Sequence, residues 1–444
     1  MHRRWIVLGL LTLLLAAPAG ANEQEAPTTM GGELEPVAVP EPTPLARRYH
    51  ETGNWIWAGD QLIAIGVPAL LLFSGASARL RQIAHRVGHY WFFEVGVYVA
   101  LYLAITFLID LPFLFYQGYV RPHAYGLSNQ DLGRWSGNVL KSLGVSMAVG
   151  VLFAWVPFAL ISRAPRRWWL YLTLLMVPFL FGVMLVKPVW VDPLFNHFGS
   201  MKDTALERKI LDLAGRAGID GSRVFEVDKS RDTKAVNAYV TGFLGTKRIV
   251  LWDTLIAKLD EPGLLFVMGH EMGHYALGHV VRSVLLSSVV ILCSLFFVDR
   301  AGRWAIARWG AQAHPHPPGT GPNGGTPAAG RFGFDRLADV AAVPLILLLT
   351  HVSAVLLAPV VNAYSRHQEF EADRFALELT RTNHSGAKAF VKLQVENLSN
   401  PRPGLFYKTF RATHPSIGER IDFCNTYHPW TNGAPLVYGG LFRR

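Results

Sequence analysis

The chain has 444 residues, of which 51% are apolar and only 17% are charged, and its formal net charge is +10. Soluble domains usually carry about a quarter charged residues, so this balance argues against a soluble globular class and favours a polytopic membrane protein. Because the positive charge lies in arginines beside apolar segments, lipid headgroups explain it better than nucleic acid, and no nucleic-acid partner is expected.

The N-terminal segment has the composition of a secretory signal. Two arginines precede a short apolar core, and Ala-Gly-Ala at 19–21 is typical of a cleavage site. We expect residues 1–21 to be a signal peptide. An uncleaved anchor helix is the alternative, but the apolar core is too short to span a bilayer comfortably. Residues 22–50 contain Pro and Glu without periodicity and predict a flexible linker.

Six further segments are long and apolar enough to cross a bilayer. They lie at approximately 56–76, 91–118, 139–162, 168–190, 281–299 and 338–361. The expected fold is therefore mainly α: a polytopic bundle of about six membrane helices after a signal peptide. Four of these helices form an N-terminal region, 51–190, and two lie within a second region, 191–430, which a tail at 431–444 follows. Residues 311–330, rich in Pro and Gly, predict a disordered loop.

Arginine placement orients these helices. Arg79, Arg81 and Arg86 follow the first span, Arg163, Arg166 and Arg167 separate the third from the fourth, and Arg300, Arg303, Arg308, Arg331 and Arg336 separate the fifth from the sixth. The opposite connection, 119–138, holds only two arginines. The positive-inside rule places the arginine-rich loops in the cytoplasm of a bacterial cell, so regions 191–280 and 362–444 would face the periplasm. A flipped topology is the alternative.

Region 191–280 reads as a small mixed α+β domain. The apolar residues Leu206, Ile210 and Leu213 repeat at helical spacing. Short strands are expected at 223–227, 236–241 and 248–252, with turn residues Gly242, Gly245 and Thr246 between the last two. Asp260-Glu261-Pro262 predicts a helix start, and the helix could continue into the fifth span.

That helix carries the sequence His270-Glu271-Met272-Gly273-His274. Residues four apart share one face of a helix, so the two imidazoles can bind a single metal ion. Glu271 then lies beside the ion, where it can take a proton from an attacking water. The pattern predicts a zinc site that needs a third protein ligand and leaves one position open.

A second acidic cluster offers that third ligand. Glu369 and Asp373 lie one turn apart on a sequence that looks helical. Glu371 competes with Glu369 for the ligand position on spacing alone. Asp373 could accept a hydrogen bond from a ligating histidine, or it could pair with Arg366 or Arg374 on a solvated face.

Several other polar residues are candidates for supporting roles. His414 or Asn362 could donate a hydrogen bond to the developing oxyanion. His279, five residues after His274, could serve only as a hydrogen-bonding residue at a helix end. The two cysteines, Cys293 and Cys424, fit no metal or redox spacing and are expected to be free thiols.

These motifs resemble a known family. The run HEMGHYALGH at 270–279 resembles the HELGHWKLNH signature of the CAAX prenyl protease 1 family, which are membrane gluzincins. Residues 362–373 look like its N-x-x-S-R-x-x-E-x-x-A-D segment, and 413–420 are similar to its T-H-P-x-x-x-E-R element. In the N-terminal third, 119–126 departs from the family pattern, because it lacks the glutamate expected there.

The resemblance implies a helix bundle around a water-filled chamber, with a zincin-like α+β catalytic domain that carries the His270–His274 motif on a helix, and one Zn²⁺ per chain. It implies that Glu369 is the third zinc ligand, with Asp373 behind the ligands, a transition-state role for His414 and a supporting role for Arg420. In zincins an edge strand pairs with the extended substrate. Here the strand containing Arg248, Ile249 and Val250, or the segment with Asn237 and Ala238, could serve.

The leading hypothesis is a zinc-dependent metalloendopeptidase of the bacterial inner membrane, with a zinc metallopeptidase domain at 191–430. It would cut extended peptides or unfolded proteins. A transporter is one alternative, motivated by Glu94, Asp110 and Lys187 in or near the spans. A zinc-stabilised binding or chaperone protein without catalysis is another, although the intact Glu271 argues against it.

Overall fold

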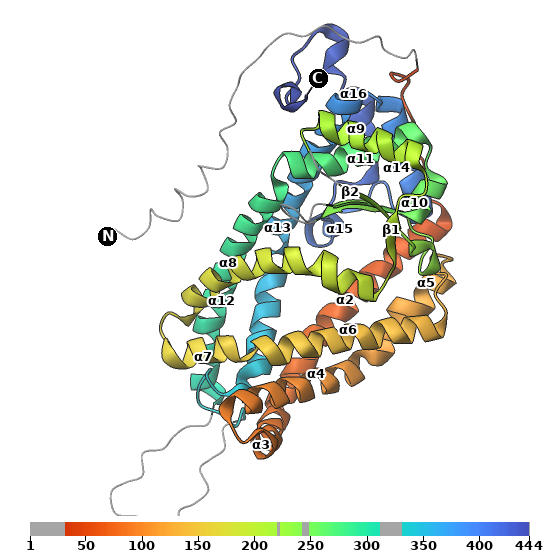
Figure 1. Cartoon of the computed structure of the whole chain (residues 1–444). Coiled ribbons are helices and arrows are strands. Elements are labelled where there is room, and N and C mark those ends of the chain that lie inside the picture. Colours follow the sequence, from red (N-terminus) through yellow and green to blue (C-terminus); the bar gives the residue numbers. More distant parts are fainter. Residues whose placement is uncertain (1–31, 220–222, 242–247, 311–330, 444) are drawn as a thin grey trace, which may run out of the picture.

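The structure is a computed structural model that describes residues 32–219, 223–241, 248–310 and 331–443. Long helices form an elongated bundle, and a small sheet with shorter helices lies at one end of it (Figure 1). The predicted signal peptide, the turn residues Gly242, Gly245 and Thr246, and the predicted loop 311–330 lie outside the described residues.

The bundle confirms the expected membrane architecture. Its long helices are α2 (Pro44–Phe73), α4 (Trp91–Phe115), α6 (Leu132–Phe153), α7 (Trp155–Arg163), α8 (Trp168–Val186), α12 (His279–Trp309) and α13 (Val343–Thr380). Within the described ranges, six helical segments are long and apolar enough to cross a membrane: Pro44–Phe73, Trp91–Ala124, Leu132–Arg163, Trp168–Leu194, His279–Trp309 and Val340–Thr380. Most of their apolar residues are not covered by protein, as expected for helices in lipid.

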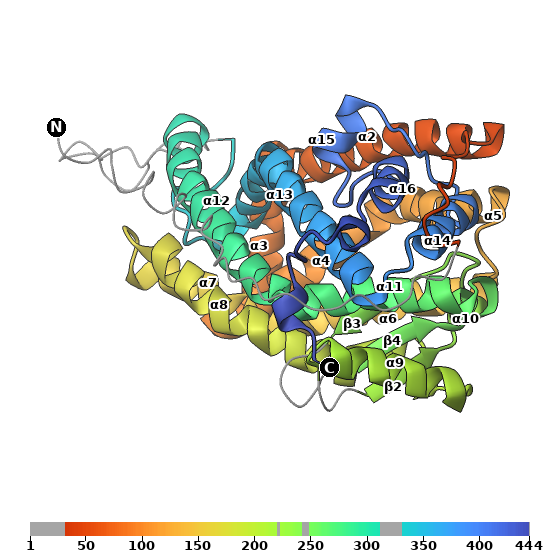
Figure 2. The ribbon, with the colours of Figure 1, turned by 90° about the horizontal axis from the view of Figure 1, so that it is seen from above.

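The two ends of the bundle differ in content. The sheet lies at one end together with α9 (Thr204–Arg216), α11 (Glu261–Ala276), α14 (Asn383–Glu396) and α16 (Ile417–Thr426) (Figure 1). The other end carries the short helix α3 (Ala76–Gly88) and α7, which bear arginines that the sequence places in cytoplasmic loops (Figure 1). Seen from above, α12, α13 and α2 lie on one side of the molecule, and α8 and α9 on the other (Figure 2).

The sheet has four strands, β1 (Phe198–Ser200), β2 (Arg223–Val227), β3 (Ala238–Thr241) and β4 (Arg248–Trp252), in the order β1-β2-β4-β3. β2 and β4 are parallel, and the other two pairs are antiparallel. Helix α9 packs on this sheet through Leu206, Ile210 and Leu213, the residues that the periodicity assigned to its apolar face. The short helix α10 (Asp253–Lys258) leads from β4 toward α11.

Helix α11 begins where the sequence predicts. The Asp260 side chain accepts a hydrogen bond from the Gly263 amide at 3.2 Å, and Pro262 occupies the first turn. The prediction that this helix could continue into the fifth span is wrong. Gly278 adopts φ +67°, a left-handed conformation that ends the helical path, and α12 starts in a new direction at His279.

The segment that precedes α2 is hydrogen-bonded to the C-terminal part of the protein. Glu33 accepts hydrogen bonds from the backbone and hydroxyl of Ser385 at 3.1 and 2.7 Å, and Val37 and Asn425 exchange two bonds of 3.0 and 2.9 Å. Helix α2 begins at Pro44 rather than near 51. The flexible-linker prediction is therefore wrong for the described residues after 32, because these bonds fix the segment across α14 and α16.

The C-terminal segment is fixed in a similar way. The carboxylate of Glu378, buried in α13, accepts hydrogen bonds from the Val437 and Tyr438 amides at 2.9 and 2.7 Å and from the Tyr427 hydroxyl.

The polypeptide between α14 and α16 forms the short helix α15 (Leu405–Phe410), and Ser416 and Glu419 form a capping box at the start of α16.

Two glycines allow α11 and α13 to pack closely. A Cβ at Gly273 would lie 3.1 Å from both the Ala372 Cα and the Phe375 Cβ, and one at Gly269 would lie 3.4 Å from the Ala376 Cα. The two glycines are one helical turn apart on the face that meets α13. Sequence reasoning did not assign them a role, although two glycines flanking His270 inside an apolar helix are a signal of close packing.

We predict that Gly273→Ala forces α11 and α13 apart by a few tenths of an ångström. Overpacking of this kind costs about 1–3 kcal/mol, so the thermal unfolding temperature of the purified protein should fall by several degrees. Gly144→Ala on α6 is the matched control, because no atom lies within 4 Å of its added Cβ. Equal unfolding temperatures for the two variants would contradict the packing role of Gly273.

Candidate metal centre

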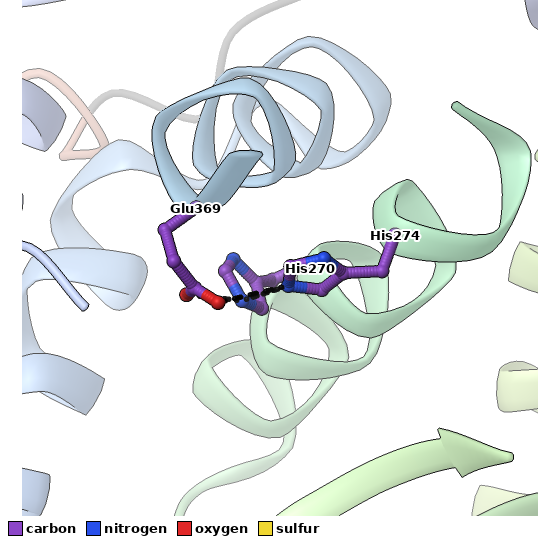
Figure 3. A group of neighbouring side chains, drawn as sticks. All are labelled: His270, His274 and Glu369. Carbon is purple, nitrogen blue, oxygen red and sulfur yellow. Dashed lines mark hydrogen bonds and ion pairs between the residues drawn. The ribbon is translucent and has the colours of Figure 1, made fainter. Parts of the chain in front are cut away.

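Three side chains converge where α11 meets α13. The Nε2 atoms of His270 and His274 lie 3.1 Å apart. Each lies 3.3 Å from one carboxylate oxygen of Glu369. Figure 3 shows the two rings on α11 and the carboxylate on α13 pointing toward one another. Within the described residues these three form a cluster whose ligand atoms all lie within 4.8 Å of one another.

The cluster has the dimensions of a zinc site. Ligand atoms at about 2.0–2.1 Å from a tetrahedral zinc ion are separated by roughly 3.3 Å, which matches the spacing of the three side chains. His270 and Glu369 are each only 6% exposed. One buried carboxylate oxygen of Glu369 has no hydrogen-bond donor, which suits a metal ligand better than a carboxylate held by protein alone. Two nitrogens and one oxygen are the donor set that zinc prefers in peptidases.

The ring of His270 is fixed from behind. Its Nδ1 lies 2.7 Å from Asp373 Oδ1, so an Nδ1–H donates to that carboxylate and Nε2 is left to face the cluster. Arg420 in turn donates to both oxygens of Asp373, from Nε at 2.8 Å and Nη2 at 2.6 Å. Burial and the Arg420 guanidinium favour the neutral ring, but Asp373 outweighs them and raises the pKa of His270 to about 9.

Asp373 therefore pairs with His270 and Arg420, and not with Arg366 or Arg374, which were the alternative partners. Arg366 donates instead to the carbonyl groups of Lys408 and Ala412, at 2.6 and 2.8 Å. The Arg374 guanidinium lies over the Tyr427 ring, 5.4 Å from its centroid. Asp373 is fully buried between His270 and Arg420 and is not part of a solvated face.

His274 is held by a second chain of contacts. Its Nδ1 lies 2.9 Å from Nδ1 of His279, and Nε2 of His279 lies 3.3 Å from Glu371. Glu371 also pairs with Arg282 at 3.3 Å. The competition between the two glutamates is thus decided by position: Glu369 faces both histidines of the cluster, whereas Glu371 contacts the residue behind one of them.

Glu271 and His414 complete the arrangement. Burial raises the pKa of the Glu271 carboxyl group, and the charges of His270 and His274 oppose this shift. His414 Nε2 lies 3.3 Å from Glu369 Oε1, and its Nδ1 contacts the Thr413 hydroxyl at 2.9 Å. The His414 side chain is 60% exposed, so it can reach a bound substrate.

The Asn362 amide donates to the Thr409 carbonyl at 3.1 Å, so this residue positions α15 beside α13. One sequence prediction needs correction. The strand with Arg248, Ile249 and Val250 is wrong as a substrate-binding edge, because β4 pairs with β2 on one side and β3 on the other. Its backbone groups are already used.

The remaining candidate for the substrate edge is β3. It is an outer strand of the sheet, it follows Asn237, and it begins at Ala238. It lies against α11, the helix that carries both histidines of the cluster.

The structure also shows the state of the two cysteines and the contacts of two charged residues in or near the membrane spans. Cys293 and Cys424 are free thiols, as predicted. Two charges that motivated the transporter alternative are paired locally: Glu94 lies 3.0 Å from His85, and Lys187 lies 2.7 Å from Asp192. Glu94 lies in the first turn of α4, and Lys187 directly follows α8.

Comparison with known proteins covers nearly the whole chain. The model of peptidase family M48 matches residues 200–427. The family described as CAAX prenyl protease N-terminal, five membrane helices, matches residues 30–197. In the described part of that segment, four helices of this chain are long and apolar enough to span a membrane.

Individual proteins agree with these family matches. An uncharacterized metalloprotease, YhfN, of Bacillus subtilis is 36% identical over 88% of each chain. A CAAX prenyl protease 1 homolog of Dictyostelium discoideum is 28% identical over 73% of this chain and 71% of its own. The crystal structure of Ste24p from S. mikatae has the same fold, with a TM-score of 0.70, 21% identity, and coverage of 85% of this chain and 87% of the other.

The paired glutamates on α13 provide a test of the ligand set. We predict that Glu369→Ala removes most of the bound zinc, whereas Glu371→Ala, two residues away on the same helix, leaves the zinc content close to that of the wild type. Metal content of the purified variants, measured by mass spectrometry, is the readout. Zinc retained in Glu369→Ala and lost in Glu371→Ala would reverse the assignment.

Proposed function

This chain belongs to peptidase family M48 and is a membrane metalloprotease, and we propose that it is a zinc endopeptidase of a bacterial inner membrane. The observation that carries this proposal is the convergence of His270, His274 and Glu369, with Glu271 on the same helix as the histidines. Three protein ligands leave a coordination position open, which is the arrangement of catalytic rather than structural zinc sites.

The protein groups have distinct roles in hydrolysis. When bound, zinc supplies a Lewis acid that polarises the peptide carbonyl and lowers the pKa of water. The Glu271 carboxylate accepts the proton of the attacking water and passes it to the leaving amine. His414, exposed beside Glu369, donates a hydrogen bond to the oxyanion. Asp373 and Arg420 keep Nε2 of His270 directed at the ion.

We further propose that the catalytic end of the bundle faces the periplasm. The arginine-rich connections lie at the end opposite the sheet, so a single orientation satisfies the positive-inside rule for the described loops (Figure 1). The predicted signal peptide supports the same orientation. The substrate would then be an extended segment of an envelope protein or peptide, whereas the relatives named CAAX prenyl protease are named for another class of substrate.

The catalytic proposal predicts that Glu271→Gln loses peptide cleavage while retaining zinc. Removal of a general base typically costs 10²–10⁴-fold in rate, so kcat should fall by about that factor or more, and a chelator should abolish the wild-type activity. Products of unfolded and of prenylated peptides are mapped by mass spectrometry, and metal content is measured in parallel. Wild-type turnover in Glu271→Gln would exclude Glu271 as the base.

The orientation proposal predicts opposite labelling of two introduced cysteines in intact cells. A membrane-impermeant maleimide should label Lys202→Cys, near the catalytic sheet, but should label Arg86→Cys on α3 only after the cells are opened. Lys202 is 85% exposed, and Cys293→Ser removes the exposed native thiol, whereas Cys424 is buried. The reverse pattern would place the catalytic end in the cytoplasm.

A further inference from the structure

A polar cavity of about 560 Å³ adjoins the metal centre. Asn237, His414 and Arg420 line it on the catalytic side. Residues of the N-terminal part of α2 and of α15 also line it, together with two further arginines, Arg121 and Arg411. The mechanism described above uses neither of them.

These two arginines are brought together over one glycine. A Cβ atom added to Gly53 would lie 3.4 Å from Nη2 of Arg121 and 3.4 Å from Nη2 of Arg411. It would lie 3.6 Å from Nη1 of Arg411. Arg121 comes from the end of the second membrane span and Arg411 from the segment after α15. A Cβ at position 53 would be in van der Waals contact with both guanidinium groups, so the two groups lie side by side against this turn of α2.

The surrounding side chains hold the guanidinium groups without neutralising them. Arg121 lies over the Tyr49 ring, 3.8 Å from its centroid, and donates to the Tyr49 carbonyl at 2.6 Å. Its Nε is buried without a hydrogen-bond acceptor, and the residue is only 8% exposed. Arg411 donates to the Asn54 side-chain oxygen, which carries no charge.

The other cations of the cavity differ in this respect. Arg402, Lys408 and Arg420 pair with Asp422, Glu419 and Asp373, respectively. Within the described part of the chain, Arg121 and Arg411 form no ion pair with a carboxylate. Burial lowers the pKa of Arg411 and the charge of Arg121 adds to this shift, whereas Tyr407 and Asp60 offset part of it. Two cations held together without a counter-ion cost free energy, and an anionic ligand would recover it.

The sheet indicates which part of a substrate would reach this place. Val236 and Asn237, just before β3, line the cavity. A peptide paired antiparallel with β3 runs in the opposite direction, so its C-terminal side lies at the start of β3. In this pairing the residues that follow the scissile bond would extend into the cavity that Arg121 and Arg411 line.

We propose that Arg121 and Arg411 form a subsite for a carboxylate on the C-terminal side of the scissile bond. The carboxylate is either the α-carboxylate of a substrate that ends nearby or an acidic side chain, because both present the oxygen pair that guanidinium groups bind. This inference rests on the proposed peptidase function and adds to it a preference for one class of peptide.

The test compares peptides that differ only in this charge. A quenched-fluorescence peptide is prepared with a free C-terminus, with a C-terminal amide, and as amides carrying Glu or Gln at successive positions after the cleavage site. For the wild type, one of the two anionic classes should exceed its neutral counterpart about tenfold in kcat/KM, the usual value of a charged hydrogen bond. In Arg411→Gln and Arg121→Gln that ratio should fall to about one.

Two further variants separate charge recognition from general damage. Arg402→Gln removes an arginine from the same cavity wall, but one that is already paired with Asp422, and it should keep the wild-type ratio. Arg411→Lys keeps the charge without the planar fork and should keep part of the ratio. Binding of labelled peptides to Glu271→Gln, with and without Arg411→Gln, reports the same preference without turnover.

The outcomes distinguish the subsite from the peptidase proposal. Cleavage of every peptide without a charge preference would overturn the subsite alone. A preference that survives in both arginine variants would overturn it as well. So would variants that change only the response to phosphatidylglycerol vesicles, since the arginines would then bind a lipid headgroup. If no peptide is cut but Glu271→Gln binds the carboxylate form through Arg411, the subsite stands and the peptidase proposal fails.

Discussion

The distance between α11 and α13 is the constraint on which the metal centre depends. His270 and His274 belong to one helix and Glu369 to the other, so a cluster with spacings of 3.1–3.3 Å exists only while the two backbones remain close. Gly269 and Gly273 allow that approach, because any side chain there would meet the backbone or the Cβ atoms of α13. Close helix packing therefore fixes the ligand positions to within a few tenths of an ångström, which a flexible loop would not do.

The buried charges around the centre are tolerated because they form a closed network. Asp373 and Arg420 are almost completely buried, and each would carry a large desolvation cost alone. Together with His270 they share three hydrogen bonds of 2.6–2.8 Å. Helix α13 has 38 residues, more than the about 20 that cross a bilayer, and its C-terminal half carries the ligand Glu369, the supporting Asp373 and the buried Glu378 that holds the C-terminal segment.

The cavity beside the centre combines two kinds of arginine. Arg420 is neutralised by Asp373 and orients a ligand, whereas Arg121 and Arg411 face the cavity without a carboxylate of their own. Two guanidinium groups without a paired carboxylate, of which Arg121 is buried, are better suited to binding an anionic ligand than to stabilising the fold. Val236 and Asn237, which precede the outer strand β3, line the same cavity.

The sequence by itself determined the features that depend on neighbouring residues. Hydropathy identified six spans, the spacing of His270 and His274 put two imidazoles on one helix face, and Asp260 with Pro262 marked where that helix starts. The tertiary structure decided what depends on residues far apart in the chain. Glu369 and Glu371 point about 160° apart on the same helix, and only the position of α11 selects between them. β4 is excluded as a substrate edge because it has a neighbouring strand on each side. Arg121 and Arg411 meet because both pack against α2 at Gly53. Neither arrangement leaves a local pattern in the sequence.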